Sequence, residues 1–70
     1  MAVLKVIELV GTSSKSWQDA IENAVERAAK TIRNIQGVDV MGWTGKINGD
    51  KIAEYRADVK ISFLVDTITG

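Results

Sequence analysis

Apolar side chains recur at helical spacing in the first half of the chain, from Trp17 to Gln36. This spacing predicts one amphipathic helix with a single apolar stripe. Ser13 or Ser16 is expected to be the N-cap, and Asp19 suits the positive end of the helix dipole. The apolar positions of the stripe are Trp17, Ala20, Ile21, Ala24, Val25, Ala28, Ala29, Ile32 and Ile35.

The predicted end of this helix depends on two signals. Lys30 and Arg33 would lie in the last turns, where positive charge complements the helix dipole. Gly37 follows directly and suits the left-handed position that often closes a helix. We therefore expect the helix to run from Trp17 to Gln36.

The rest of the chain has the pattern of extended strands. An apolar run from Ala2 to Val10 ends at Gly11, a second run covers Val38 to Ile47, and a third covers Lys51 to Val65. Asn48-Gly49 between the last two is a strong signal for a tight hairpin. In the third run alternate residues are apolar, which predicts one face packed on the helix. Those apolar residues are Ala53, Tyr55, Ala57, Val59, Ile61, Phe63 and Val65.

These elements predict a single α+β domain over residues 1–70, with the order β-α-β-β and a three-stranded antiparallel sheet curled around one amphipathic helix. The third strand, at about 3.3 Å per residue, would extend well beyond a helix that rises about 1.5 Å per residue. The first strand is apolar on both faces, whereas one helix can cover only one face of a sheet. The uncovered surface predicts association with other copies.

Composition supports the same expectation. With 70 residues, the free energy gained by burying apolar surface is about equal to the conformational entropy lost on folding. The chain has no Cys and no His, so disulfides are excluded and the commonest transition-metal sites are disfavoured. A small secreted domain is normally rich in disulfides, so we expect a cytoplasmic location. Homo-oligomerisation remains as the means of stabilisation.

Charge and residue types narrow the function classes. Nine basic and nine acidic residues give a formal net charge of zero, and nucleic-acid binders normally carry a basic excess. The first apolar run is too short to span a bilayer, so no membrane partner is expected. Without His or Cys, the common general base, the thiolate nucleophile and His-dependent triads are absent. We therefore expect a binding protein rather than an enzyme.

Several residues have alternative interpretations. Glu22 and Glu26 lie one turn apart but are better interpreted as solvated partners of nearby bases than as paired catalytic carboxylates. Asn48-Gly49-Asp50 lacks the ligand spacing of a calcium loop and is better interpreted as a turn, so no metal site is assigned from the residues themselves. Trp17 and Trp43 suit core packing, interface packing or stacking on a flat ligand.

The chain resembles the dodecins over nearly its whole length. The resemblance is carried by Val6-Ile7-Glu8-Leu9-Val10-Gly11-Thr12-Ser13, by the order and length of the helix and hairpin, and by Glu54-Tyr55-Arg56 with the run Lys60 to Phe63. It implies a small β-α-β-β subunit of a hollow homododecamer. It also implies a non-enzymatic storage protein that binds flavins such as FMN or riboflavin between subunits.

The sequence departs from the flavin-binding members of that family at three positions. Their stacking Trp aligns with Gly37, their Arg aligns with Thr44, and their Gln aligns with Arg56. One interpretation is a dodecin shell that binds a flavin or another planar ligand through Gly37, Thr44 and Arg56, with Trp43 replacing the lost ring. The alternative is a flavin-free dodecin shell that binds a cation such as calcium or serves only as an assembly.

Overall fold

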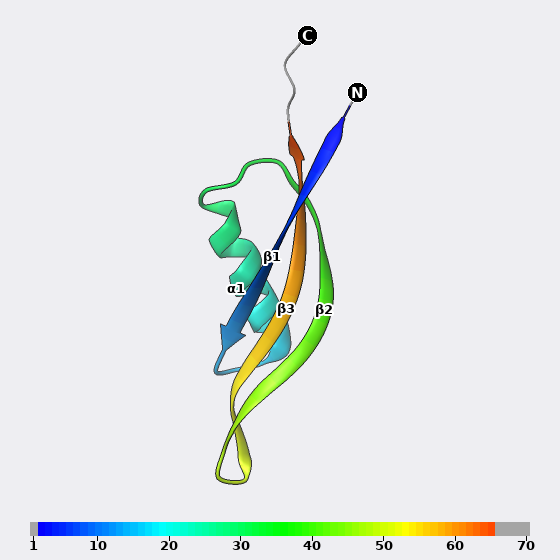
Figure 1. Cartoon of the computed structure of the whole chain (residues 1–70). Coiled ribbons are helices and arrows are strands. Elements are labelled where there is room, and N and C mark those ends of the chain that lie inside the picture. The colour runs from blue at the N-terminus through cyan, green and yellow to red at the C-terminus, as the bar shows by residue number, and fades with distance from the viewer. Residues whose placement is uncertain (1, 66–70) are drawn as a thin grey trace.

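The computed structural model describes residues 2–65, which form one helix and three strands (Figure 1). Strand β1 covers Val3–Ser13, helix α1 covers Trp17–Ala29, β2 covers Ile35–Asn48 and β3 covers Lys51–Val65. The order β-α-β-β is therefore confirmed, as is the antiparallel three-stranded sheet. The predicted bounds of β3 are also correct.

The sheet has the strand order β1-β3-β2, so β3 is central and pairs with both neighbours. The alternation predicted for β3 fits this central position. In an antiparallel sheet with one covered face, alternate residues of a strand are apolar and polar. Ala57, Val59 and Ile61 are fully buried beneath the helix. Gly49 has a φ of 70° in the turn after Asn48, as the hairpin signal predicts.

Three alanines bring the helix close to the sheet. Ala20, Ala24 and Ala28 recur every four residues and form the buried stripe of α1. They pack on the buried residues of β3, with half-buried Ile7 and Leu9 beside them. Because four of the six buried core residues are alanines, the core of the chain is thin.

The start of the helix agrees with the sequence, and its end does not. Ser16 is the N-cap, and its side-chain oxygen accepts a hydrogen bond from the Asp19 backbone N–H at 3.0 Å. The helix ends at Ala29, so the predicted end at Gln36 is wrong. Asn34 adopts the left-handed conformation, with a φ of 61°, in the connection to β2.

The apolar pattern continues past the true end of the helix because the next segment also packs on the core. Ile32 and Ile35 contact the core from the connection and from the start of β2, so their apolar character does not require a helix. Gly37, predicted to close the helix, is a residue of β2 paired with Ser62.

Strand β1 also extends further than its apolar run. Gly11, Thr12 and Ser13 pair with β3 instead of forming a turn. Gly11 is required there because a Cβ at this position would lie 2.0 Å from the Ala20 carbonyl oxygen. The strand passes directly beneath the helix at this residue.

The chain is elongated. Its principal extents are 57 × 20 × 12 Å and its radius of gyration is 14.6 Å, against about 11 Å for a compact domain of this length. Its accessible surface is 5145 Å², against about 4,300 Å² for a compact protein of this mass. The β2–β3 hairpin extends beyond the helix, as the strand lengths predicted (Figure 1).

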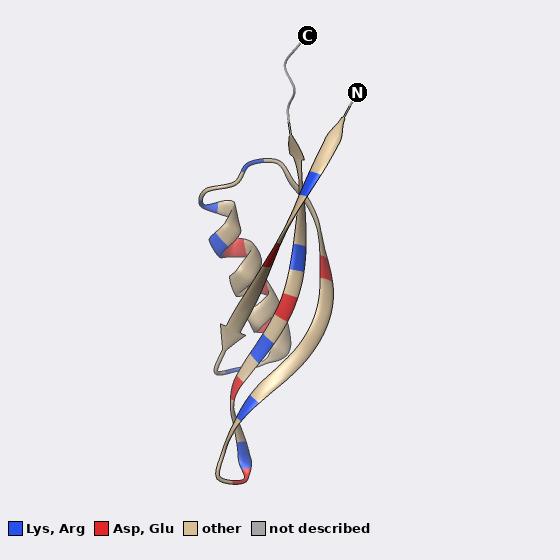
Figure 2. Cartoon of the chain, viewed as in Figure 1, with Lys and Arg blue, Asp and Glu red and all other residues tan. Residues whose placement is uncertain are grey.

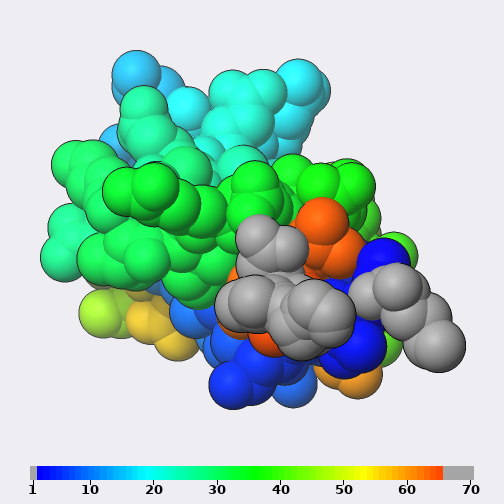
Figure 3. Space-filling view, turned by 90° about the horizontal axis from the view of Figure 1, so that it is seen from above, coloured from blue at the N-terminus to red at the C-terminus, as the bar shows by residue number. Residues whose placement is uncertain are grey.

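The helix covers one face of the sheet only. Figure 3 shows the helix segment on one side of the molecule and the β1 segment on the opposite side. On the uncovered face, hereafter the outer face, Leu4, Val6 and Val10 of β1 are all more than half exposed. No helix within residues 2–65 has the length and hydropathy needed to cross a bilayer.

Candidate functional site

An aromatic cluster lies on the helix side of the sheet, near the start of α1. The ring centroids of Trp17 and Tyr55 are 4.8 Å apart, and those of Trp17 and Trp43 are 5.9 Å apart. Both pairs are edge-to-face, an arrangement favoured by the ring quadrupoles. The cluster therefore joins the helix, β2 and β3 through one central ring, Trp17.

Trp17 is fixed at both ends of its side chain. Its Nε1–H donates to the Thr44 carbonyl oxygen at 2.8 Å. Gly45 lies beneath the ring, and a Cβ added there would be 4.0 Å from Trp17 Cζ2 and 3.4 Å from Ile52 Cγ2. Trp17 is thus held in one orientation before any ligand arrives.

Trp43 is the open member of the cluster, with 55% of its surface exposed. A large aromatic ring held against a fixed neighbour can stack on a planar ligand at a low cost in conformational entropy. Nearby Ile47 and Ile52, on the part of the hairpin beyond the helix, are also exposed. This open ring and its apolar surroundings are the strongest candidate for ligand binding on the helix side.

The four cofactor-binding residues predicted from sequence do not meet within one subunit. Thr44 and Arg56 are register partners, so they lie together on the outer face. Trp43 is paired with Ala57, which is buried beneath the helix, so Trp43 lies on the opposite face. Gly37 is paired with Ser62, six residues from Arg56 along β3, or about 20 Å away.

Gly37 could carry a side chain only with a small movement of one neighbouring side chain. The nearest atom to an added Cβ is the Ser62 hydroxyl oxygen at 3.3 Å, and that side chain is small. The same hydroxyl lies 3.5 Å from the Gly37 carbonyl oxygen, to which it donates. A Cβ at this position therefore requires the Ser62 side chain to move by a few tenths of an ångström.

The outer face carries the charged residues of the central strand. Arg56 Nε donates to Glu54 Oε1 at 2.7 Å, the one ion pair found within residues 2–65. Asp58 Oδ1 is buried and has no hydrogen-bond partner among the described residues. The pKa of Glu8 is raised, first because protonated Glu8 forms a hydrogen bond with Asp58 and second because of the charge of Asp58. The charge of Lys60 opposes this rise in the pKa.

Glu8 and Asp58 make a carboxylate pair, but they are not a complete cation site. Within the part of the chain that the structure describes, no three acidic side chains gather around a common point. Calcium takes about six to eight oxygen ligands, so a single subunit supplies too few here. Asn48 and Asp50 flank a tight hairpin turn.

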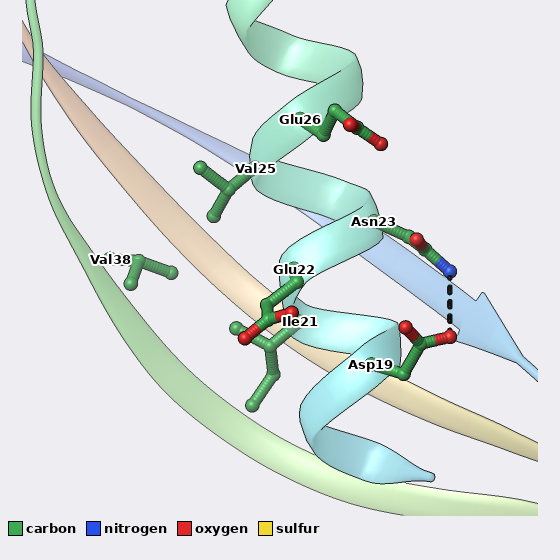
Figure 4. A pocket seen from close by; sticks show the side chains of 7 residues that line it. All are labelled: Asp19, Ile21, Glu22, Asn23, Val25, Glu26 and Val38. Carbon is green, nitrogen blue, oxygen red and sulfur yellow. Dashed lines mark hydrogen bonds between the residues drawn. The ribbon is translucent and has the colours of Figure 1, made fainter. Parts of the chain in front are cut away.

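Sequence reasoning did not identify a groove of about 580 Å³ between α1 and β2 (Figure 4). It forms because the helix packs on β1 and β3 and makes few contacts with β2. The strand order, which sequence patterns did not reveal, is the cause. The lining residues are Asp19, Ile21, Glu22, Asn23, Val25, Glu26 and Val38.

An open sheet with one helix, a thin core and exposed aromatic and apolar surfaces defines a small subunit suited to binding and association. Residues 3–66 match the family model described as Dodecin, so the chain belongs to the dodecin family. This is a family of small binding proteins rather than known enzymes.

Relatives agree over nearly the whole chain. A dodecin of Thermus thermophilus is 34% identical over 64 residues, covering 91% of this chain and 93% of the relative. Calcium dodecin of Mycobacterium tuberculosis is 33% identical over 63 residues, covering 90% and 89%.

Solved structures show the same fold. The dodecin of Streptomyces coelicolor has a TM-score of 0.92 at 30% identity, with 96% of both chains covered. The calcium dodecin of M. tuberculosis, described as calcium chelating, has a TM-score of 0.81 at 29% identity, with 97% of both chains covered.

Proposed function

We propose that this chain is the subunit of a cytoplasmic homododecamer that stores a small planar ligand, such as FMN or riboflavin, in the seams between subunits. The observation that carries the proposal is the open Trp43 ring, held against a fixed Trp17 on an elongated subunit with uncovered apolar surface. Burying such surface between copies creates closed, apolar pockets at the subunit interfaces, where stacking on a planar ligand is favourable.

The placement of the predicted residues supports a location between subunits. Trp43 lies on one face of the sheet, while Thr44 and Arg56 lie on the other. A ligand that contacts both sets needs two different copies of the chain. Arg56 could then bind a phosphate or carboxylate of the ligand with its free guanidinium N–H groups.

The test is a titration with FMN and riboflavin in dim light, followed by fluorescence quenching of the flavin. Wild-type protein is expected to quench at micromolar ligand, and Trp43→Leu to bind about tenfold more weakly, since it loses a ring contact worth about 1 kcal/mol beyond its area. Met41→Leu is the control, because Met41 is exposed on the same strand outside the regular pairing. Equal affinities of Trp43→Leu and wild type would exclude stacking on Trp43.

A second substitution examines the position of the missing ring. Gly37→Trp is expected to increase flavin affinity, because the position corresponds to the stacking ring of flavin-binding relatives and the one close neighbour of an added Cβ is the movable Ser62 side chain. Gly37→Leu is its control, since it adds apolar bulk without a π-system. A gain with Leu equal to that with Trp would attribute the effect to hydrophobic area alone.

Calcium is the alternative ligand, favoured by the neighbouring carboxylates of Glu8 and Asp58 and by the relative described as calcium chelating. Two subunits that share a seam could supply more oxygen ligands than one. Calorimetric titration with Ca²⁺ tests this, with Asp58→Asn expected to abolish the binding and Asp50→Asn, at the hairpin turn, expected to retain it. If Asp58→Asn leaves the heat of calcium binding unchanged, a calcium site at Asp58 is excluded.

A further inference from the structure

The tip of the β2–β3 hairpin places a glycine directly after an asparagine. Asn48 is the last residue of β2, and Gly49 and Asp50 form the turn that leads to β3. All three residues are exposed, and the tip lies beyond the end of the helix, at the opposite end of the chain from β1's first residues (Figure 1). Water therefore has access to the Asn48 side-chain amide.

An Asn-Gly pair carries a nucleophile and an electrophile in one short segment. The Gly49 backbone nitrogen and the Asn48 amide carbon Cγ can close a five-membered ring, so they react as neighbours within one molecule. Glycine has no Cβ to obstruct this approach. The packing of the chain also leaves space, because a Cβ added at Gly49 would have no atom from another part of the chain within 4 Å.

The Gly49 N–H is not held by the sheet. Asn48 and Lys51 are the last register partners of β2 and β3, so Gly49 lies outside the ladder. The register shifts between Lys46 and Ile47, and only two register pairs separate this irregularity from the turn. So short a hairpin end, without a helix packed over it, opens at a low cost in free energy. Opening allows the Asn48 backbone to rotate and bring Cγ to the Gly49 nitrogen.

The other two asparagines of the chain lack this combination. Asn23 is followed by Ala24 within α1, and its side-chain nitrogen donates to the Thr12 carbonyl oxygen at 3.0 Å. Asn34 is followed by Ile35, whose branched side chain obstructs the approach to its own backbone nitrogen. The chain thus contains one reactive pair and two internal references for it.

We propose that Asn48 is a site of self-catalysed deamidation. The Gly49 N–H loses its proton to water or hydroxide, and the nitrogen attacks Asn48 Cγ. The new N–Cγ bond replaces the Cγ–Nδ2 bond, and ammonia leaves. Water then opens the resulting succinimide ring at either carbonyl carbon: opening at Cγ gives aspartate, and opening at the main-chain carbon gives isoaspartate. The reaction needs no oxidant, reductant, flavin or metal ion.

Both products change the charge of the hairpin tip. Each adds one carboxylate to a chain whose formal net charge is zero. The new carboxylate lies close to Asp50 in the turn and opposite Lys51, the register partner of Asn48. Figure 2 shows charges of both signs at this tip. The modified chain is therefore more acidic than the newly made chain, and its fraction rises with time.

The isoaspartate product also changes the backbone. The main chain then passes through the former side chain and becomes longer by one methylene group, so position 48 no longer matches Lys51 in the register. Ile47 and Ile52, both exposed, form the adjacent pair and would lose a regular neighbour. The hydrophobic core includes neither isoleucine, so the rest of the fold is expected to persist.

The test is a timed incubation of the folded, full-length protein, followed by peptide mapping with mass spectrometry. Conversion of amide to acid is expected at Asn48 and not at Asn23 or Asn34. Isoaspartate should be among the products, because direct hydrolysis of the side chain gives aspartate only. Ion-exchange chromatography of the intact protein should show a more acidic species that accumulates over the same period.

Two variants isolate the ring-closing step. Asn48→Gln keeps the amide but would have to close a less favourable six-membered ring, so it is expected to lose the modification at this position. Asn48→Asp supplies one of the two products and should elute with the acidic species. Far-ultraviolet circular dichroism of both variants should equal that of wild type, because the tip lies outside the core. Conversion of Asn48→Gln as fast as wild type would contradict attack by Gly49.

The same chain unfolded in guanidinium chloride gives the reference rate for an unrestrained Asn-Gly pair. The folded chain is expected to react more slowly than this reference, because the hairpin end must first open, but to convert within the same experiment. A folded chain that retains its Asn48 amide until the unfolded chain has converted completely would overturn the inference. Equal conversion of Asn23, Asn34 and Asn48 in the folded chain would overturn it as well.

Discussion

Small side chains determine how closely the helix and the sheet approach. Gly11 of β1 lies directly below Ala20 and Ala24 of α1. Sequence patterns marked Gly11 as the end of a strand, because glycine commonly interrupts strands. The actual reason for glycine is the backbone contact with the helix, and only the packed structure reveals it.

Gly11→Ala is expected to destabilise the fold by about 3 kcal/mol, because the new methyl group would overlap the Ala20 carbonyl oxygen and separate the two layers. Gly42→Ala is the matched control, since an added Cβ there has no atom within 4 Å. Urea denaturation at a fixed protein concentration measures both. Equal midpoints for the two variants would show that the layers can separate at little cost.

The Glu8 carboxyl gives a pH dependence whose sign follows from its raised pKa. The folded protein holds this proton more tightly than the unfolded chain, in which the ordinary pKa is 4.5. Its contribution to stability is therefore present below about pH 4.5 and is lost as the pH rises through the folded pKa. Above that pKa, the charge of Asp58 repels the ionised Glu8 carboxylate.

Glu8→Gln is accordingly expected to raise the denaturation midpoint at about pH 7, with an advantage over wild type that shrinks towards about pH 4. Denaturation curves across that range provide the measurement. Glu22→Gln, on the exposed side of α1, should show no such trend. An advantage of Glu8→Gln that is independent of pH would rule out repulsion by Asp58 as its cause.

At the scale of elements, the sequence predicted the number, type and order of the helix and strands, and it predicted the start of α1 and the bounds of β3. It failed at the end of α1 because apolar periodicity reports burial and not hydrogen bonding. Ile32 and Ile35 are packed on the core from a connection and a strand, yet they continue the helical spacing.

The start of α1 contains two serines with different roles. Ser16 caps the helix, while the buried Ser13 hydroxyl donates to Asp19 Oδ2 at 2.6 Å and accepts from the Lys15 backbone N–H at 2.8 Å. The sequence left both as candidate caps because either serine precedes the apolar stripe. Their separate contacts depend on how the chain turns between β1 and α1.

Ser16→Ala is expected to cost about 1 kcal/mol of stability, the usual loss for an N-cap oxygen. Ser14→Ala, at an exposed position in the same connection, should be close to neutral. Thermal denaturation of the two variants at equal concentration compares them. A loss shared by both would indicate a general effect of the connection and not of the cap.

At the scale of the whole molecule, sequence reasoning predicted the excess of uncovered apolar surface but could not assemble the candidate site. Trp43 and Arg56 are on opposite faces because a bulge between Val40 and Gly42 and the strand register decide which way each side chain lies. Those are properties of paired strands, and a lone strand pattern does not contain them.

The thin core predicts that apparent stability depends on protein concentration. Among the described residues of one subunit, only Ile61 and Val59 are large and fully buried. If association supplies the remaining burial, the denaturation midpoint should rise steadily across a roughly hundredfold range of concentration. A midpoint that stays constant across that range, for a species that sediments as a monomer, would contradict an obligate assembly.

The alanine stripe of α1 also bears on how long the proposed assembly would keep the same chains. A chain that leaves its neighbours would retain a core in which four of the six buried residues are alanines, so departure and unfolding should coincide. If two samples are assembled with different fluorophores and then mixed, they should not exchange chains for as long as unfolding is slow. Brief exposure to mild denaturant should allow the labelled chains to exchange.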